Sequence, residues 1–280
     1  MNRAMINASV TMGQIQRQID TIANNIANVN TIGYKRREVT FSDLLFQQVN
    51  NQLVPSQEVG RLTPNGIRVG SGAKVAQTAV RMNQGNLQKT DRELDVAITQ
   101  KDQFFQVQVY DNGEMQVRYT KDGSFYFSPN PNNPNELYLV TGQGHFVLGQ
   151  NGPIVIPANH QGITISENGL ISITDENGNI QDVAQLELVR VHRPQMLEQI
   201  GENLFALPDN LVELGYVPAD ILNVIPPAEV SVRQGYIEMS NVDLSKELTD
   251  LINAQRSYQF NARSVTMADQ MLGLINSIRS

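Results

Sequence analysis

The chain has 280 residues, of which 40% are hydrophobic, and it carries a formal net charge of -7. That length is enough for one large or two ordinary domains with buried cores. Because the sequence contains no cysteine, disulfides, thiolate metal sites and a cysteine nucleophile are excluded. The negative charge argues against a nucleic-acid partner, since such proteins normally present a basic face to the phosphates.

The first 29 residues show an uninterrupted seven-residue apolar repeat. Its positions are Met5, Ala8, Met12, Ile15, Ile19, Ile22, Ile26 and Val29. A strict repeat of this kind keeps one seam of a helix against a partner helix. The alternative is that this helix and the one predicted at the other end of the chain are ordinary surface helices packing on a globular domain, but the uninterrupted repeat favours a partner helix. At about 1.5 Å per residue this seam is roughly 37 Å long, which favours a helical partner.

A second amphipathic helix is predicted at the other end of the chain. Ser240, Asn241 and Asp243 precede it, and their side-chain oxygens can accept hydrogen bonds from a first helical turn. Its apolar stripe contains Leu244, Leu248, Leu251, Tyr258, Ala262, Val265, Ala268, Leu272 and Ile275. We expect residues 12 to 26 of the first seam to face Leu251, Tyr258, Val265 and Leu272.

The N-terminal helix is predicted to end between Val29 and Gly33, where asparagines gather and glycine permits left-handed torsions. The segment that follows holds a short apolar group, Phe41 to Phe46, and then a polar run. This pattern indicates one or two helical turns and then a linker.

From Arg61 the chain changes to short alternating segments separated by turn residues. Asn-Gly pairs begin at residues 65, 112, 151, 168 and 177, and an Asp-Gly pair begins at 122. Asn-Gly suits two-residue hairpins because both residues accept positive φ. Phe105, Val107 and Val109 alternate as in a half-buried strand, and similar segments continue to Val191. Residues 61–207 are therefore expected to form an antiparallel β domain.

The predicted fold class is mixed α and β, with long N- and C-terminal helices forming a coiled-coil-like helical domain and an antiparallel all-β domain inserted between them. The expected segments are 1–37 (N-terminal assembly helix and turn), 38–60 (linker), 61–207 (β domain), 208–239 (extended connection) and 240–280 (C-terminal assembly helix).

No catalytic, cofactor or metal site is predicted from the sequence. His145, His160 and His192 are isolated, and the glycine-rich stretch 142–152 lacks the Lys-Ser/Thr ending of a phosphate loop. A pair of carboxylates like that of a glycosidase stays open, because only three-dimensional spacing defines it. No run approaches the roughly 18 apolar residues of a membrane span, and no secretory signal is recognisable at the N-terminus.

Three ordered blocks of the sequence resemble the bacterial flagellar rod and hook family. The N-terminal block is NNIANVNTIGYKR, residues 24–36, in which Asn24, Asn25, Asn28, Gly33 and Tyr34 match the family signature. The central block comprises residues 83–98, 104–107 and 118–125, and the C-terminal block comprises residues 235–272. One departure is Gln103, where the family commonly has a glycine before the Phe-Phe pair.

The resemblance implies a structural subunit, not an enzyme, with no cofactor. Residues 62–75, 156–173 and 200–205 are similar to subunits of the distal rod. The implied function is a helical tube that transmits torque from motor to hook. The implied partners are further copies of the chain, proximal rod and hook subunits, and the flagellar type III export apparatus, which family members use without a cleaved signal peptide.

Two other functions stay open at this point. A hook or hook-junction subunit would occupy a different position in the same axis. A surface β domain that binds or cuts cell-wall glycan would belong to a different class, and its terminal helices would only hold a dimer together.

Overall fold

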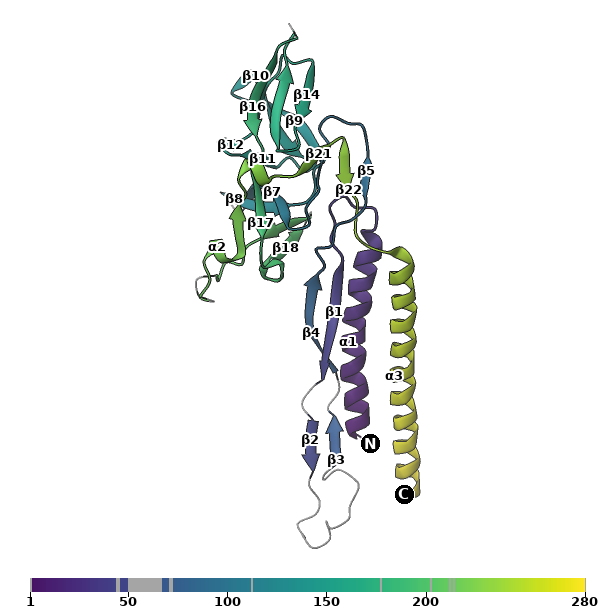
Figure 1. Cartoon of the computed structure of the whole chain (residues 1–280). Coiled ribbons are helices and arrows are strands. Elements are labelled where there is room, and N and C mark those ends of the chain that lie inside the picture. Colours follow the sequence, from purple (N-terminus) through teal and green to yellow (C-terminus); the bar gives the residue numbers. More distant parts are fainter. Residues whose placement is uncertain are drawn as a thin grey trace, which may run out of the picture. The chain divides into compact units, whose positions relative to one another are not determined.

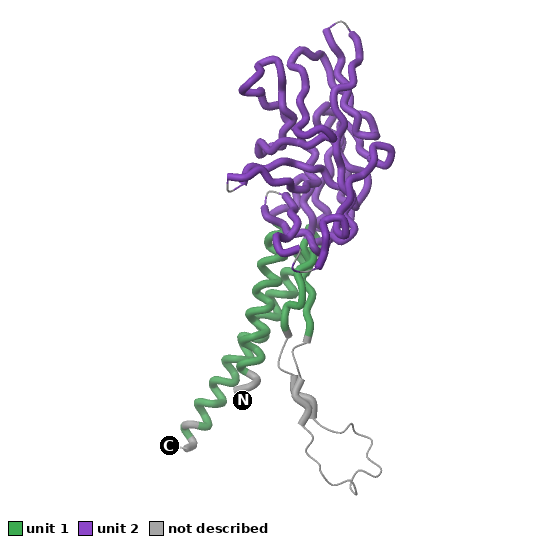
Figure 2. Tube along the Cα trace, turned by 90° about the vertical axis from the view of Figure 1, so that its left-hand side faces the viewer, with its two compact units in different colours: residues 1–26, 37–79, 244–280 green, residues 27–36, 80–243 purple. Residues whose placement is uncertain are grey.

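The computed structural model of the chain describes residues 2–43, 46–49, 67–70, 73–111, 113–176, 178–201, 203–211, 213 and 215–279. Two compact units make up the chain (Figure 2). Unit 1 consists of residues 1–26, 37–79 and 244–280, and unit 2 of residues 27–36 and 80–243. The five-segment division expected from the sequence stays a prediction. Half of segment 62–75 and the turn residues Asn65, Asn112 and Asn177 lie outside the described residues.

Unit 1 contains the two long helices, α1 (Asn2–Ala27) and α3 (Leu244–Arg279). They lie side by side and run in opposite directions (Figure 1). The described strands of this unit form two antiparallel pairs, β1 (Arg37–Asp43) with β4 (Ala73–Val80) and β2 (Phe46–Val49) with β3 (Ile67–Gly70). The β1–β4 ribbon is held to α1 by a hydrogen bond from the backbone N–H of Val75 to Gln14 Oε1, at 3.0 Å. The mixed α and β fold class is thereby confirmed.

The local predictions for this unit are confirmed at the start of α3, are two residues off at the end of α1, and are wrong between the helices. α3 begins at Leu244 as expected, and α1 ends two residues before Val29. The helical turn expected around Phe41 is wrong, because residues 37–43 are strand β1. Phe41 and Thr40 there are exposed, and the strand is stabilised by pairing with β4, which lies more than 30 residues further along the chain. The sequence of residues 37–43 alone does not indicate that they pair with β4.

Unit 2 is built around an eleven-stranded antiparallel sheet among the described residues. Its main path runs β13-β10-β11-β7-β8-β19-β18. Unit 2 also has three smaller sheets, with the strand orders β14-β15-β16, β21-β6 and β22-β5. The bounds are β5 (Leu87–Lys89), β6 (Val96–Ile98), β7 (Gln103–Asp111), β8 (Glu114–Thr120), β9 (Phe125–Asn130), β10 (Asn133–Thr141), β11 (Phe146–Gly149), β12 (Gly152–Pro153), β13 (Val155–Pro157), β14 (Gly162–Ile165), β15 (Leu170–Thr174), β16 (Ile180–Gln185), β17 (Leu188–Val191), β18 (Glu198–Gly201), β19 (Leu204–Ala206), α2 (Pro218–Ile221), β20 (Leu222–Val224), β21 (Val232–Gln234) and β22 (Tyr236–Glu238), with single 3-10 turns at Pro194–Met196 and Pro227–Glu229.

Strand β7 separates two hydrophobic cores. Phe105 and Val107 point into the larger core, whereas Phe104 points into the smaller one. Because successive side chains of a strand point to opposite faces, a strand buried on both faces reads as the apolar pair Phe-Phe in the sequence. Strand β19 shows the same division, since Leu204 belongs to the larger core and Phe205 to the smaller.

Two of the predicted hairpin turns are confirmed. A hairpin joins β11 to β12 through Gln150 and Asn151, with Gly152 at φ +107° already paired to Gly149. Asn168-Gly169 lies in the turn between β14 and β15, with Gly169 at φ +80°. Asp122-Gly123 is not a hairpin turn, since β9 pairs with β10 instead of β8. At Gly123 an added Cβ would lie 1.7 Å from the carbonyl oxygen of Val96, so this glycine serves a close backbone approach.

The connection after residue 207 is more structured than expected. Residues Pro218–Ile221 form the short helix α2, and β20 pairs with β17 at the side of the main sheet. The prediction of an extended chain is wrong for α2. Ile221 is fully buried in the smaller core, which explains why this polar-looking segment folds onto the sheet.

Candidate assembly helices and the junction of the signature segments

The predicted seam of α1 packs against α3 within the chain. Ile15, Ile22 and Ala254 form a buried cluster, and around it lie the partly buried Ile19, Ile26, Leu251 and Tyr258. Six of these seven residues belong to the stripes expected from the sequence. The two helices therefore satisfy part of each other's seam before any other molecule is involved.

The remaining seam residues differ in burial. Ala8 is buried, Met5, Met12, Val29, Ala262, Val265 and Leu272 are half-buried, and Leu244, Leu248 and Ile275 are exposed. Sequence reasoning placed Ala268 on the stripe but missed Ala254, and both are buried. Together with the buried Glu247 they follow a seven-residue spacing, which was the available signal. Small residues at this spacing let two helix backbones approach closely.

A second apolar surface runs along the outside of α3. Phe260, Met267 and Leu274 are 70%, 53% and 64% exposed, and they repeat every seven residues. At 3.6 residues per turn they lie about 120–160° around the helix from Ala254. Ile252 and Met271 add further exposed apolar area on α3, as do Ile6 and Val10 on α1. We call Phe260, Met267, Met271 and Leu274 the outer face of α3.

Asn25 of the N-terminal signature joins three elements of unit 1. Its Oδ1 accepts a hydrogen bond from the backbone N–H of Arg37 at 3.0 Å, and its Nδ2 donates to the Arg37 carbonyl at 2.8 Å. The same Nδ2 also donates to Glu247 Oε2 at 3.1 Å. Asn25 and Glu247 are each 1% exposed. One buried amide thus holds α1, the start of β1 and the first turns of α3 together.

The other signature residues shape the turn after α1. Asn28 accepts from the hydroxyl of Thr31 through its side chain and from the Thr31 N–H through its carbonyl. Gly33 has φ +69°, and Tyr34 is buried. Asn24 is exposed on α1. Glycine is required at position 33 for two reasons: the positive φ, and the close packing, since an added Cβ would lie 2.7 Å from the backbone nitrogen of Asp122.

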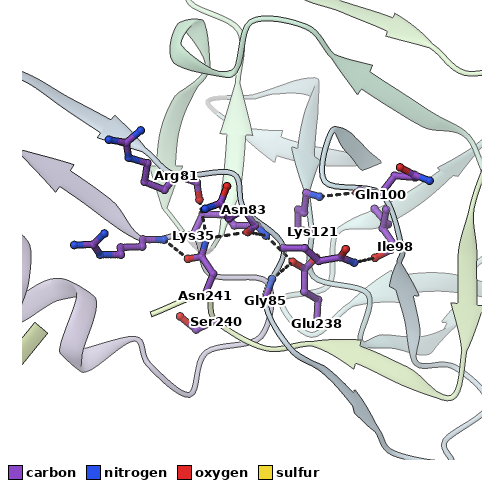
Figure 3. A network of polar contacts seen from close by, with 12 residues as sticks. Lys35, Arg81, Asn83, Gly85, Ile98, Gln100, Lys121, Glu238, Ser240 and Asn241 are labelled. Carbon is purple, nitrogen blue, oxygen red and sulfur yellow. Dashed lines mark hydrogen bonds and ion pairs between the residues drawn. The ribbon is translucent and has the colours of Figure 1, made fainter. Parts of the chain in front are cut away.

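The three signature blocks meet inside unit 2 at a buried ion pair (Figure 3). Lys35 Nζ lies 2.6 Å from Glu238 Oε1, and the two side chains are 0% and 1% exposed. Lys35 Nζ also donates to the carbonyl of Asn83 at 3.0 Å, and Glu238 Oε1 accepts from the N–H of Gly85 at 2.8 Å. We call the three segments 33–36, 81–86 and 238–241 the junction.

Asn241 extends the junction with one side chain. Its Oδ1 accepts from the N–H of Arg36 at 2.7 Å, and its Nδ2 donates to the carbonyls of Arg81 and Asn83 at 2.7 and 2.8 Å. Gly85 permits this packing, since an added Cβ would lie 1.9 Å from the carbonyl oxygen of Met239. The conformations of the three segments are thereby mutually dependent.

The charge of Lys121 interacts with the charges of both residues of this ion pair, Lys35 and Glu238. Lys121 Nζ donates to the carbonyl of Gln100 at 3.1 Å and lies 4.9 Å from the centroid of the Phe104 ring. Burial lowers the pKa of Lys121 to about 7; Glu238 opposes this shift, and the Lys35 charge adds to it. Burying a charged ammonium group at this position costs folding free energy, so unit 2 is less destabilised when the Lys121 side chain is deprotonated.

Gln103, the departure from the family pattern, has a structural role. It is fully buried in β7, its Nε2 donates to the carbonyl of Glu229 at 2.9 Å, and its Oε1 accepts from the N–H of Ser231 at 3.3 Å. The side chain therefore ties β7 to the segment before β21. Glycine at this position could not supply these two hydrogen bonds.

None of the described residues forms a group of three or more histidines and carboxylates able to hold a metal ion. Likewise, no described helix is long and apolar enough to cross a membrane. The features that stand out are thus two helices with apolar faces and a buried polar junction, which are means of holding and joining protein segments.

Sequence models of three protein families match the chain. The C-terminal region of flagellar basal body rod FlgEFG proteins matches residues 233–278, the D1 domain of the flagellar hook protein FlgE/F/G matches residues 98–173, and the flagella basal body rod protein matches residues 5–35. These ranges contain nearly all of α3, the centre of the main sheet and most of α1. They also contain Lys35, Lys121 and Glu238.

Curated relatives match along the whole chain. The flagellar hook-basal body complex protein FlhP of Bacillus subtilis is 45% identical, with all of both chains covered. The flagellar basal-body rod proteins FlgG of Borreliella burgdorferi and Agrobacterium fabrum are 37% and 36% identical, with 100% and 98% of this chain and 99% and 98% of theirs covered. The chain therefore belongs to the flagellar rod and hook FlgE/F/G family, as a FlgG-like, non-enzymatic structural subunit of the basal-body rod.

Proposed function

We propose that the chain is a subunit of the distal rod, and that copies of it assemble into a helical tube that transmits torque from motor to hook. The observation that carries this proposal is the outer face of α3. The inner side of α3 is occupied by α1 of the same chain, so the outer face is left for a neighbouring molecule.

The neighbour proposed is a second copy of the chain. Phe260, Met267 and Leu274 follow the seven-residue spacing that suits contact with another long helix, as does the α1 seam. Burying side chains of this size stabilises an interface by about 1.5–3 kcal/mol each. Two faces of one helix pair that contact different surfaces make a heterologous interface, and such an interface propagates into a filament when it does not close into a ring.

At the ends of this assembly the partners are proximal rod subunits on one side and hook subunits on the other. The flagellar type III export apparatus is proposed as the route of the chain to the rod. A hook or hook-junction subunit remains the alternative function, and it differs from the rod proposal by the position of the chain along the axis.

The test is a gene deletion in a motile bacterium that carries the chain, followed by electron microscopy of purified basal bodies. We expect rods that stop short and no hooks. Full rods without hooks would favour the hook-junction alternative, and normal hooks and filaments would refute both positions in the axis.

The same strain tests the outer face of α3. Complementation with Phe260→Asn/Met267→Gln should leave rods short, because two apolar contacts between copies are lost. The matched control is Gln255→Asn/Asp269→Asn, which changes two exposed polar positions of α3 away from the outer face and should restore hooks. Hooks formed by the Phe260 and Met267 variant would remove the outer face from the interface.

A further inference from the structure

The polypeptide passes between the two units at four places. These lie between residues 26 and 27, 36 and 37, 79 and 80, and 243 and 244. At three of these crossings the chain reaches the junction within a few residues inside unit 2. Arg36 lies at the crossing after residue 36, Arg81 follows the crossing after residue 79, and Asn241 precedes the crossing after residue 243. The fourth enters unit 2 through the turn that leads to Gly33. All covalent connections between the units therefore run through, or directly next to, the same buried cluster.

Five backbone amides join the junction segments to one another. Each of these amides donates to a residue in one of the other two segments. The bonds are Gly33 to the Glu238 carbonyl (2.8 Å), Arg36 to Asn241 Oδ1 (2.7 Å), Arg81 to the Arg36 carbonyl (2.8 Å), Gly85 to Glu238 Oε1 (2.8 Å) and Met239 to the Asn86 carbonyl (2.9 Å). No segment is thus held by one bond alone.

The ion pair makes these bonds interdependent. Glu238 Oε1 accepts from both Lys35 Nζ and the Gly85 N–H, and its own backbone carbonyl accepts from Gly33. Moving segment 33–36 or 238–241 away would leave a charge buried without its partner, which is far more costly than losing one exposed hydrogen bond. Moving segment 81–86 away would take one hydrogen-bond partner from each of the two charged groups. The junction should therefore open as a whole or not at all.

We propose that the junction is a cooperative clamp that shares mechanical load over the four crossings between the two units. This proposal rests on the proposed rod function, because only a torque-bearing subunit experiences such load. Lys35, Glu238 and Asn241 act as positioning residues, since they hold backbone segments and contact no other molecule in this role.

Hydrogen exchange on the purified full-length chain tests the cooperativity. Asn241→Ala removes three hydrogen bonds, of which only one is to a junction amide, that of Arg36. A cooperative clamp predicts roughly fivefold or greater acceleration of exchange at all five amides. Acceleration at Arg36 alone would overturn the proposal.

A second variant and a control complete this test. Lys35→Met/Glu238→Met replaces the ion pair by apolar side chains without leaving a buried charge, so the fold should persist. It should also accelerate exchange at the five amides together. The control Lys89→Ala breaks the exposed Lys89–Asp91 pair of the same unit and should leave all five amides unchanged.

Swimming under load tests the mechanical part. In a strain whose only copy carries Asn241→Ala, rods and hooks should form, swimming in dilute medium should be unchanged, and swimming in viscous medium should fall at least twofold relative to Lys89→Ala. Equal speeds in viscous medium would overturn load sharing, as would missing rods, which would assign the junction to assembly instead. Neither result depends on the deletion phenotype that tests the rod function.

Discussion

Single buried polar residues carry much of the specificity of this chain. Asn25, Lys35 and Glu238 are almost completely buried, and each bonds to a segment far away in the sequence. Buried polar groups are costly unless they are paired, so each of these residues requires its partners in place. Consequently, changes at these positions should affect more than one element.

Lys121 should make the stability of unit 2 depend on pH. The folded state loses the Lys121 proton near pH 7, whereas the unfolded state keeps it up to about 10.5. Between these values the unfolded state binds more protons, so the free energy of unfolding rises with pH, by up to about 1.4 kcal/mol per pH unit from this group. Below pH 7 the destabilisation is fully present.

Guanidinium unfolding at pH 7 and pH 9 measures this effect. Lys121→Met should lower the pH dependence and be relatively more stable at pH 7. Lys101→Met, an exposed lysine of the same unit, should keep the wild-type slope. If Lys121→Met and the wild type share one slope, the buried lysine is not the titrating group.

At the element scale, helices α1 and α3 depend on each other. Their shared cluster is small, and α3 carries exposed apolar residues on its other side. Helical stability in proteins comes chiefly from packing of an apolar face instead of from propensity. Disrupting the shared cluster or Asn25 should therefore loosen both helices.

Ile19→Asp/Ile22→Asp should abolish rod assembly while leaving unit 2 folded. The two carboxylates would enter the cluster around Ala254, where neither finds a positive partner among the described residues of that cluster. Far-UV circular dichroism of the purified chain should show a loss of helix, and basal bodies should lack complete rods. Ser9→Asp/Ala23→Asp, at exposed positions of α1, is the control for helix content; normal rods from the isoleucine variant would rule out the seam.

Asn25→Asp should destabilise the helix pair by about 3 kcal/mol. The substitution removes the donor to the Arg37 carbonyl and places a carboxylate 3.1 Å from that of Glu247. Thermal melting of the helical signal should shift downward. The neighbouring exposed residue provides the comparison, since Asn24→Asp should melt close to the wild type, and equal shifts for both would contradict the assigned role of Asn25.

At the scale of the whole molecule, the compact units do not follow the order of the sequence. Residues 27–36 follow the N-terminal helix directly, but they belong to unit 2, where Lys35 pairs with Glu238. The expectation that residues 1–37 form one segment thus combines a helix of one unit with a turn of the other. Two truncations of the N-terminus can distinguish the contribution of the helix from that of the turn.

Deleting residues 1–26 should keep the calorimetric unfolding transition of unit 2 within a few degrees of the full chain. Deleting residues 1–36 should lower it by roughly 6–20 °C or abolish it, because Glu238 would remain buried without Lys35, at a cost of about 3–5 kcal/mol. Equal transitions for the two truncations would show that residues 27–36 do not contribute to unit 2.

The sequence by itself determined the features that depend on local periodicity. The seven-residue repeat located the N-terminal helix, and an apolar stripe located the C-terminal one. The Leu251 and Tyr258 stripe was found with its partner Ile15–Ile26 because a helix face has a fixed spacing. Alternation located the strands of unit 2, and the three signature blocks gave the family. The seam's part in contacts between copies stays a prediction.

Only the tertiary structure decided which distant residues meet. Lys35 and Glu238 are 203 residues apart, and Asn25 and Glu247 are 222 apart, so no periodic pattern connects them. Residues 37–43 form a strand for the same reason, since β1 exists through its pairing with β4. Side-chain spacing along one element is set by backbone geometry, whereas pairing between elements is set by packing of the whole fold, and the sequence records only the first directly.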